Sequence, residues 1–221
     1  MIFAFLDMGF SGNELLMIIL AFALAIMIAL VFHEWAHAYA AYKSGDPTAK
    51  MMGRMTLNPA KHVQPMGLLS FVFIGIGWAK PVPVNPFNYR NFRRGNFWVS
   101  IAGVLTNFIL GFFASLFLFM MWHFGDPNAN LGLFFLSIFF EFTMVINISL
   151  MLFNLIPVPP LDGYNLMISL TKPNNRYMNW ARQNQHWLMI AVLMLLIFTG
   201  ALMNLREGII WLFNSLWSWI F

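Results

Sequence analysis

The sequence predicts an all-helical protein that crosses a membrane several times. Hydrophobic residues make up 60% of its 221 positions and charged residues 9%, whereas a soluble domain has about 25% charged residues. Several apolar runs approach or exceed the roughly 20 residues that a helix needs to cross a bilayer. We therefore predict about four to six membrane helices, with a re-entrant or β-like segment near residues 50–86. The absence of cysteine excludes a disulfide scaffold and a cysteine-ligated metal site.

Each predicted span is an apolar run of suitable length. The four runs cover residues 14–40, 97–122, 131–153 and 186–204. Residues 205–221 follow, and their tryptophans suit either an interfacial helix or a short, tilted span. Residues 66–79 are apolar over only 14 positions and contain three glycines. We expect this last segment to be re-entrant or buried, because irregular backbone at membrane depth must be covered by protein or line a wet cavity.

The positive charges lie almost entirely on one side of these spans. Eight of the twelve Lys and Arg residues lie between residues 43 and 94, and three more lie between the third and fourth runs. A full span at residues 66–79 would divide the eight equally between the two sides. The positive-inside rule assigns the basic side to the cytoplasm, which leaves the N-terminus outside. The net charge of +4 does not indicate nucleic acid binding, and we expect no nucleic acid partner.

An H-E-x-x-H pattern occupies the end of the first run, at His33, Glu34 and His37. Histidines four residues apart lie on one face of a helix and can reach a common zinc ion. Glu34 could then take a proton from a zinc-bound water. Ionisable groups are costly inside a membrane, so their clustering there favours a functional site over a structural one.

A catalytic zinc site needs a third protein ligand. The candidates are Asp162, Glu141, His62, His123 and His186. His123 and His186 lie near predicted membrane boundaries, where surface positions are expected. Glu141 could be a ligand, or it could face a neighbouring helix or a wet cavity. Asp162 follows three prolines that interrupt any helix, so it begins a new one, where its carboxylate could instead be an N-cap. Spacing alone leaves the choice open.

Two patterns in the sequence resemble the site-2 protease family of intramembrane zinc metalloproteases. They are His33-Glu34-x-x-His37 and Asn154-x-x-Pro157-x-Pro159-x-Leu161-Asp162-Gly163. Further segments resemble the short bacterial form of that family, which has no inserted PDZ domain and no nucleotide-sensing domain. These are Asn58-Pro59-x-x-His62, Pro65-x-Gly67, the run from Lys80 to Pro86, and Gly103-x-x-x-Asn107. The chain departs from this form at Gln64, where Asp is common, and at Val104, where Pro is common.

The resemblance implies a role for each matching residue. His33, His37 and Asp162 would bind one Zn²⁺ per chain, and Glu34 would be the general base. Asn154 would line the site and hold the substrate backbone or the oxyanion, although it could instead cap the broken helix. Asn107 and His62 are possible accessory residues.

The resemblance also implies an activity and a place in the cell. The chain would hydrolyse peptide bonds in or near transmembrane segments of membrane proteins, in a bacterial plasma membrane. The charge distribution separately predicts an active site toward the cytoplasm, because His37 is near the cytoplasmic end of the first span. We expect residues 1–221 to form one integral membrane protease domain, with a catalytic core at about 14–170 and C-terminal helices at about 186–221. The segment 66–86 could offer an edge that pairs with an unwound substrate. The sequence gives no indication of the oligomeric state.

Two other functions fit part of this pattern. A transmembrane metal transporter would also use His and Asp ligands, but a transport site needs no general base such as Glu34. A channel would also continue its polar residues across the membrane, whereas Leu15–Phe32 is wholly apolar. A catalytically inactive scaffold that binds membrane helices would not need an intact Glu34 and Asp162.

Overall fold

The computed structural model describes residues 10–62, 64, 66–67, 80–172 and 175–221, and all regular structure in these ranges is helical. The helices are α2 (Gly12–Ser44), α3 (Thr48–Met51), α4 (Pro59–His62), the 3₁₀ helix η1 (Pro86–Asn88), α6 (Phe92–Phe124), α7 (Leu131–Asn154), α8 (Asp162–Leu170), α9 (Arg176–Gln183), α10 (Gln185–Thr199) and α11 (Ala201–Ile220). The predicted all-helical class is confirmed.

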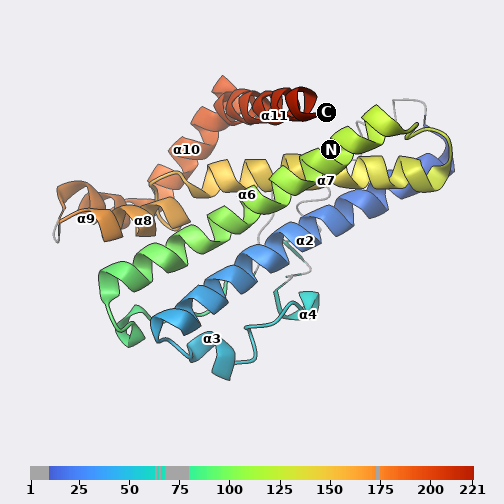
Figure 1. Ribbon diagram of the computed structural model, residues 1–221. Helices are drawn as coiled ribbons and strands as arrows, with labels where there is room; N and C mark the ends of the chain where they lie inside the picture. The colour runs from blue at the N-terminus through green and yellow to red at the C-terminus, as the bar shows by residue number, and fades with distance from the viewer. Residues whose placement is uncertain (1–9, 63, 65, 68–79, 173–174) are drawn as a thin grey trace.

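Three long helices, α2, α6 and α7, pack lengthwise against one another and form the body of the molecule (Figure 1). Each is long and apolar enough to cross a membrane, and α10 with α11 adds a fourth span if this bent pair counts as one. The helices contain the predicted runs 14–40, 97–122 and 131–153 and extend a few residues beyond them. The number of spans therefore agrees with the lower end of our prediction.

The ends of these helices follow from their capping residues. Ser11 and Glu14 form a reciprocal capping box at the start of α2, and Gly45 ends that helix in a left-handed conformation. The side chain of Asn91 caps the start of α6, and that of Asn130 caps the start of α7. These polar residues satisfy backbone N–H groups that have no partner inside a helix, which fixes where each long helix begins.

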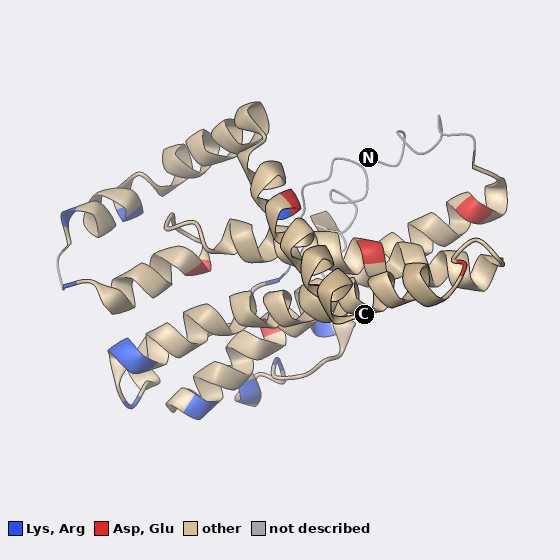
Figure 2. Ribbon diagram, turned by 45° about the horizontal axis from the view of Figure 1, so that its top comes forward, with Lys and Arg blue, Asp and Glu red and all other residues tan. Residues whose placement is uncertain are grey.

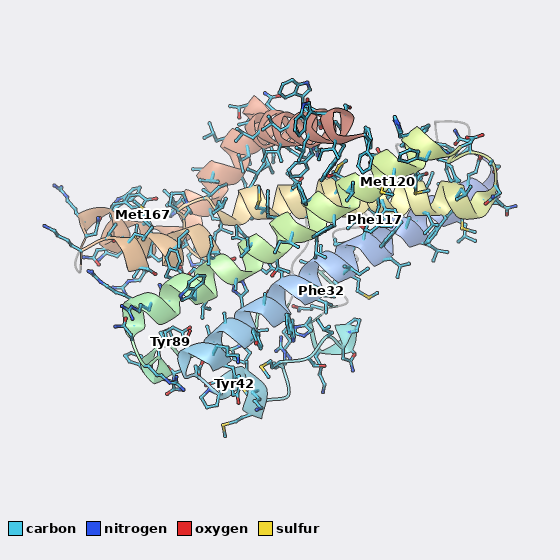
Figure 3. All side chains as sticks on the ribbon, in the orientation of Figure 1. Phe32, Tyr42, Tyr89, Phe117, Met120 and Met167 are labelled. Atoms are coloured by element: carbon cyan, nitrogen blue, oxygen red, sulfur yellow. The ribbon has the colours of Figure 1, made fainter. Side chains whose placement is uncertain are left out.

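Small residues bring the long helices into contact. Ala21, Ala25 and Ala29 are fully buried along α2, and the last two form a cluster with Phe22, Ile26 and Ile146 of α7. Helices in a membrane associate through close van der Waals packing rather than the exclusion of water, and small side chains permit it. Near the other end of α2, Tyr89 packs with Ala41 and with Val99 of α6 (Figure 3). Helices α2 and α6 are therefore in contact close to the H-E-x-x-H pattern.

The C-terminal region differs from the prediction. The predicted span 186–204 is interrupted at Gly200, which has a φ of 61° and separates α10 from α11 by a bend of 62°. Helix α11 packs on α6 and α7, with Trp217 buried and its indole N–H donating to Ser115 Oγ at 3.0 Å. Trp211 and Trp219 remain 66% and 84% exposed. The predicted boundary after residue 204 is wrong, because the break between the two helices lies at Gly200, and the interfacial position of the tail stays a prediction.

The predicted re-entrant or β-like segment is only partly described. Residues 68–79, most of the segment 66–79, lie outside the described residues. The described part of residues 50–86 contains α3, α4 and the start of η1, and no strand. The Lys80 N–H donates to the His62 carbonyl at 2.8 Å, which brings these two residues together beside α2.

Charged residues are distributed unevenly along the bundle. Figure 2 shows most Lys and Arg residues at the end that holds the C-terminus of α2, the N-terminus of α6 and α9. The opposite end carries Glu14 at the start of α2 and Asp126 in the loop between α6 and α7. The asymmetry expected from the sequence is therefore present in the folded chain.

Candidate metal centre

Helix α2 presents His33 and His37 on one face, one turn apart. Their Nε2 atoms lie 3.0 Å from each other, with the ring planes nearly perpendicular. Both side chains are largely shielded, with 10% and 12% of their surface exposed. Because residues four positions apart in a regular helix lie on the same face, the two imidazoles converge on one point.

Asp162 reaches the same point from a distant part of the chain. It is the first residue of α8, after the proline-containing segment 155–161 that follows α7. Its Oδ2 atom lies 3.4 Å from His33 Nε2 and 3.2 Å from His37 Nε2. Leu161 is the N-cap of α8, and no side chain caps this helix. The alternative in which Asp162 is the N-cap is therefore wrong.

These three donor atoms fit a zinc ion. A tetrahedral zinc with ligand bonds of about 2.0–2.1 Å holds its ligand atoms about 3.3–3.4 Å apart, and the observed separations are 3.0, 3.2 and 3.4 Å. Asp162 Oδ2 is also buried without a hydrogen-bond partner. A buried carboxylate oxygen needs a proton donor or a cation, so this set of atoms could hold a metal.

Helix α6 orients both imidazoles through contacts to their Nδ1 atoms. Asn107 Oδ1 lies 2.8 Å from His33 Nδ1, and the Val99 carbonyl oxygen lies 2.7 Å from His37 Nδ1. When each Nδ1–H donates to its oxygen, both Nε2 atoms carry lone pairs directed to the space beside Asp162. Hydrogen bonds of this kind fix the tautomer and orientation of metal-binding histidines.

Gly103 allows α6 to approach this closely. A Cβ atom at this position would lie 2.5 Å from His37 Nε2 and 2.6 Å from His33 Cε1, so a side chain would collide with both rings. Gly103 thus makes room for both histidines, and Asn107 binds one of them, His33. The spacing of the Gly103-x-x-x-Asn107 pattern places both residues on one face of α6.

Glu34 contacts a different segment. Its Oε2 accepts a hydrogen bond from the Val82 N–H at 2.8 Å. Arg54 holds the two residues before Val82 by donating from Nη2 to the Lys80 carbonyl at 2.7 Å and to the Pro81 carbonyl at 3.2 Å. The segment that starts at Lys80 is thus fixed beside Glu34, which lies between the two histidines in the sequence, and its backbone binds that carboxylate.

The buried carboxylate of Asp46 anchors the other end of this segment. It accepts hydrogen bonds from the Asn85 N–H at 2.6 Å and from Asn88 Nδ2 at 2.8 Å, and another from Thr48 Oγ. Burial alone raises the pKa of Asp46, but these hydrogen bonds favour the carboxylate and hold the pKa below its ordinary value. Asp46 therefore stays charged and keeps the segment next to the end of α2.

Other residues considered from the sequence lie elsewhere. Among the described residues, the cluster of possible ligands contains only His33, His37 and Asp162. His62 is buried, with Nε2 2.6 Å from the Thr56 carbonyl oxygen. Glu141, His123 and His186 are exposed on α7, α6 and α10. Asn154 donates from Nδ2 to the Leu150 carbonyl within its own helix, at 3.0 Å.

Sequence reasoning missed four contributors to this region: the Val99 carbonyl, the Val82 N–H, Asp46 and Arg54. The first two are backbone groups, so their side chains carry no signal. Asp46 and Arg54 are polar residues in a polar stretch, where a solvent-exposed position is the ordinary expectation. Their burial, at 0% and 7% exposed, appears only in the folded chain.

Comparison with known proteins gives a consistent assignment. Residues 126–198 match the model of peptidase family M50. The chain is 42% identical to Putative zinc metalloprotease YwhC of Bacillus subtilis over 153 residues, which are 69% of this chain and 70% of that protein. It is 29% identical to Putative zinc metalloprotease Rip2 of Mycolicibacterium smegmatis, over 85% of this chain and 71% of that protein. No solved structure matches the chain. The chain therefore belongs to peptidase family M50, the site-2 protease family that its two sequence patterns indicate.

Proposed function

We propose that this chain is an intramembrane zinc metalloprotease that hydrolyses peptide bonds in or near transmembrane segments of membrane proteins. One observation carries the proposal. Three donor atoms, from His33, His37 and Asp162, converge within 4.8 Å of one another. The two histidines and Glu34 belong to α2, which is long and apolar enough to cross a membrane. Family membership supports the reaction class.

In this proposal His33, His37 and Asp162 hold one Zn²⁺ per chain. When bound, the metal supplies Lewis-acid chemistry, since it polarises a carbonyl and lowers the pKa of water. Asn107 and the Val99 carbonyl accept hydrogen bonds from the Nδ1–H groups, which selects the tautomer whose Nε2 lone pair faces Asp162. Asp162 contributes a negative charge that offsets part of the charge of the cation.

Glu34 is the general base. The Val82 N–H binds Oε2, so the carboxylate is held in one orientation and Oε1 accepts the proton of the attacking water. The same carboxyl group then returns that proton to the departing amine nitrogen. The substrate helix must unwind first, because an intact helix engages its carbonyls in its own hydrogen bonds.

Asn154 remains a candidate for binding the substrate backbone or the oxyanion. Its Nδ2 donates to Leu150 in the present structure, so the side chain would have to rotate to reach a substrate. His62 would have an accessory role through the segment it supports, because its carbonyl accepts the Lys80 N–H.

We further propose one orientation for the whole chain, as a single membrane protease domain. The end that holds most Lys and Arg residues (Figure 2) would face the cytoplasm of a bacterial cell. The N-terminus of α2 would then be outside. The metal-binding pattern, near the C-terminal end of α2, would lie in the cytoplasmic half of the membrane.

The test combines zinc content with cleavage of a model transmembrane peptide. The proteins are wild type, Glu34→Gln, Asp162→Ala and, as a control, Glu141→Gln, which changes a carboxyl group of α7 outside the cluster. We expect about one zinc per chain in wild type, Glu34→Gln and Glu141→Gln, and loss of zinc in Asp162→Ala. Only wild type and Glu141→Gln should cleave the peptide.

Each departure from this pattern has a definite meaning. Full zinc retention in Asp162→Ala would contradict its role as the third ligand. Undiminished cleavage by Glu34→Gln would contradict its role as the base. Zinc without cleavage in every form would favour the scaffold, and zinc flux into proteoliposomes that contain wild type would favour the transporter.

A further inference from the structure

A hollow separate from the candidate metal centre lies at the basic end of the molecule, between the start of α6 and helices α8 and α9. Its volume is about 230 Å³, and its wall is formed by Phe92, Arg93, Tyr164, Ile168, Thr171, Lys172, Asn175, Met178, Asn179 and Arg182. It contains none of the four residues of the metal centre.

The wall of this cavity is strongly cationic. Arg93, Lys172 and Arg182 all line it, and none of its ten residues is acidic. Within the described part of the chain, Arg206 is the only Lys or Arg at ion-pair distance from a carboxylate. The described residues therefore give the three positive charges around the cavity no negative partner.

The wall is held in place by contacts beneath it. The Tyr164 hydroxyl donates to the Met178 carbonyl at 2.9 Å, which joins α8 to α9. Asn96 Nδ2 donates to the Asn165 carbonyl at 2.6 Å, which joins α6 to α8. Arg93 Nη2 donates to the Thr171 carbonyl at 3.0 Å and still has other N–H donors available. These bonds connect the three helices that surround the hollow, so its shape is defined by the fold.

Size and surroundings indicate what could occupy the cavity. Drug-sized ligands use pockets of about 300–1,000 Å³, so a volume of about 230 Å³ suits a smaller group. Trp180 on α9, the helix that carries Asn179 and Arg182 of the lining, is 49% exposed, and Trp187 near the start of α10 is 76% exposed. Exposed tryptophan together with Lys and Arg is typical of the membrane–water interface, where the anionic groups are lipid phosphates.

We propose that this cavity binds a phosphate group, and that an anionic phospholipid of the adjoining leaflet supplies it. Arg93 offers a planar set of N–H donors to the phosphate oxygens, and Lys172 and Arg182 in the same lining add positive charge. The hydroxyl of Thr171 and the amides of Asn175 and Asn179 add uncharged polar groups to the wall. The bound lipid would tie α8, which carries Asp162, to the start of α6.

Binding is tested directly on the full chain in neutral detergent. Native mass spectrometry measures retention of phosphatidylglycerol and phosphatidylcholine, and calorimetry measures binding of inorganic phosphate. The variants are Lys172→Gln, Arg182→Gln and the pair together. Arg94→Gln and Arg176→Gln are matched controls, because these exposed arginines lie on α6 and α9 near the cavity but do not line it.

We expect wild type to retain phosphatidylglycerol in preference to phosphatidylcholine. Each single cavity variant should weaken that binding about fivefold, and the double variant about 25-fold. The controls should stay within about twofold of wild type. The side chains of Lys172 and Arg182 make no hydrogen bond to another described residue, so the thermal unfolding midpoint should not change.

Two results would overturn the proposal. One is an equal loss of binding in the Arg94→Gln and Arg176→Gln controls, since that is the behaviour of a diffuse basic surface. The other is retention of neither phosphatidylglycerol nor inorganic phosphate. Binding of inorganic phosphate without lipid retention would support the phosphate site and identify a soluble source in place of the lipid. None of these measurements uses proteolysis, so their failure would leave the proposed activity untouched.

Discussion

Replacing Gly103 by alanine isolates the contribution of helix α6 to the metal centre. The added Cβ would lie 2.5 Å from His37 Nε2 and 2.6 Å from His33 Cε1, whereas ordinary contacts begin at 3.4 Å. The rings or the helix must therefore move by about 0.9 Å. The collision involves two imidazoles that are themselves fixed by hydrogen bonds to α6, so a displacement of the ligands is expected.

Gly103→Ala should change the free energy of unfolding only slightly but lower the metal affinity strongly. Alanine improves helix propensity by about 1 kcal/mol over glycine, while overpacking costs about 1–3 kcal/mol. The net destabilisation should therefore be about 0–2 kcal/mol, which leaves the chain folded. Disturbing the groups that orient metal-binding histidines lowers metal affinity by about 10–100-fold, and we expect a loss of this size in Gly103→Ala.

The assay is zinc content after dialysis against a chelator of known affinity, with the thermal unfolding midpoint measured in parallel. Gly111→Ala is the matched control. It makes the same change on the same helix, but its Cβ would meet the Ile148 side chain, at 2.8 Å from Cδ1. Wild-type zinc affinity in Gly103→Ala, or an equal loss in Gly111→Ala, would refute the reasoning.

Three further variants test other contacts. Asn107→Ala removes the acceptor for His33 Nδ1 and should weaken zinc binding about 10–100-fold in chelator competition; unchanged affinity would show that Asn107 does not orient the ring. Asp46→Asn should lower the free energy of unfolding by about 1–3 kcal/mol at neutral pH. Because the folded pKa of Asp46 is lowered, this stabilisation is present above about pH 4 and is lost as the pH falls through the folded pKa, so thermal unfolding between pH 7 and 3 should be less pH-dependent in the variant. Trp217→Phe loses the hydrogen bond to Ser115 and should cost about 0.5–1.5 kcal/mol, measured by the same method, with Trp219→Phe at an exposed position as the unaffected control.

The metal centre was predictable to the extent that its residues are close in sequence or belong to a recognisable pattern. His33 and His37 follow from helix geometry alone, since four residues make roughly one turn. Spacing did not decide between Asp162 and Glu141, and the resemblance of the second pattern favoured Asp162. The structure agrees in bringing Asp162 to the histidines, and it excludes the capping alternative.

Other features depend on long-range contacts that periodicity does not encode. The Glu34 carboxylate accepts its hydrogen bond from the backbone N–H of Val82, so the identity of the Val82 side chain does not signal the pairing. Hydropathy continues through Gly200 into Ala201, Leu202 and Met203, and an apolar run therefore concealed the bend between α10 and α11. Trp217 donates a hydrogen bond to Ser115, which lies more than 100 positions earlier in the chain. Composition alone could not predict that Trp217 is buried in this contact.

The donor set also couples metal occupancy to the folding of the chain. Two donors belong to one rigid helix, whereas the third lies about 125 positions further along, after the end of α7. A bound ion would therefore cross-link the two halves of the chain. Its binding free energy would then add to the free energy of unfolding. At free zinc about 100-fold above the dissociation constant, this linkage adds about 2.7 kcal/mol. Chelation should accordingly lower the unfolding midpoint of wild type and leave that of Asp162→Ala unchanged, which differential scanning calorimetry can measure.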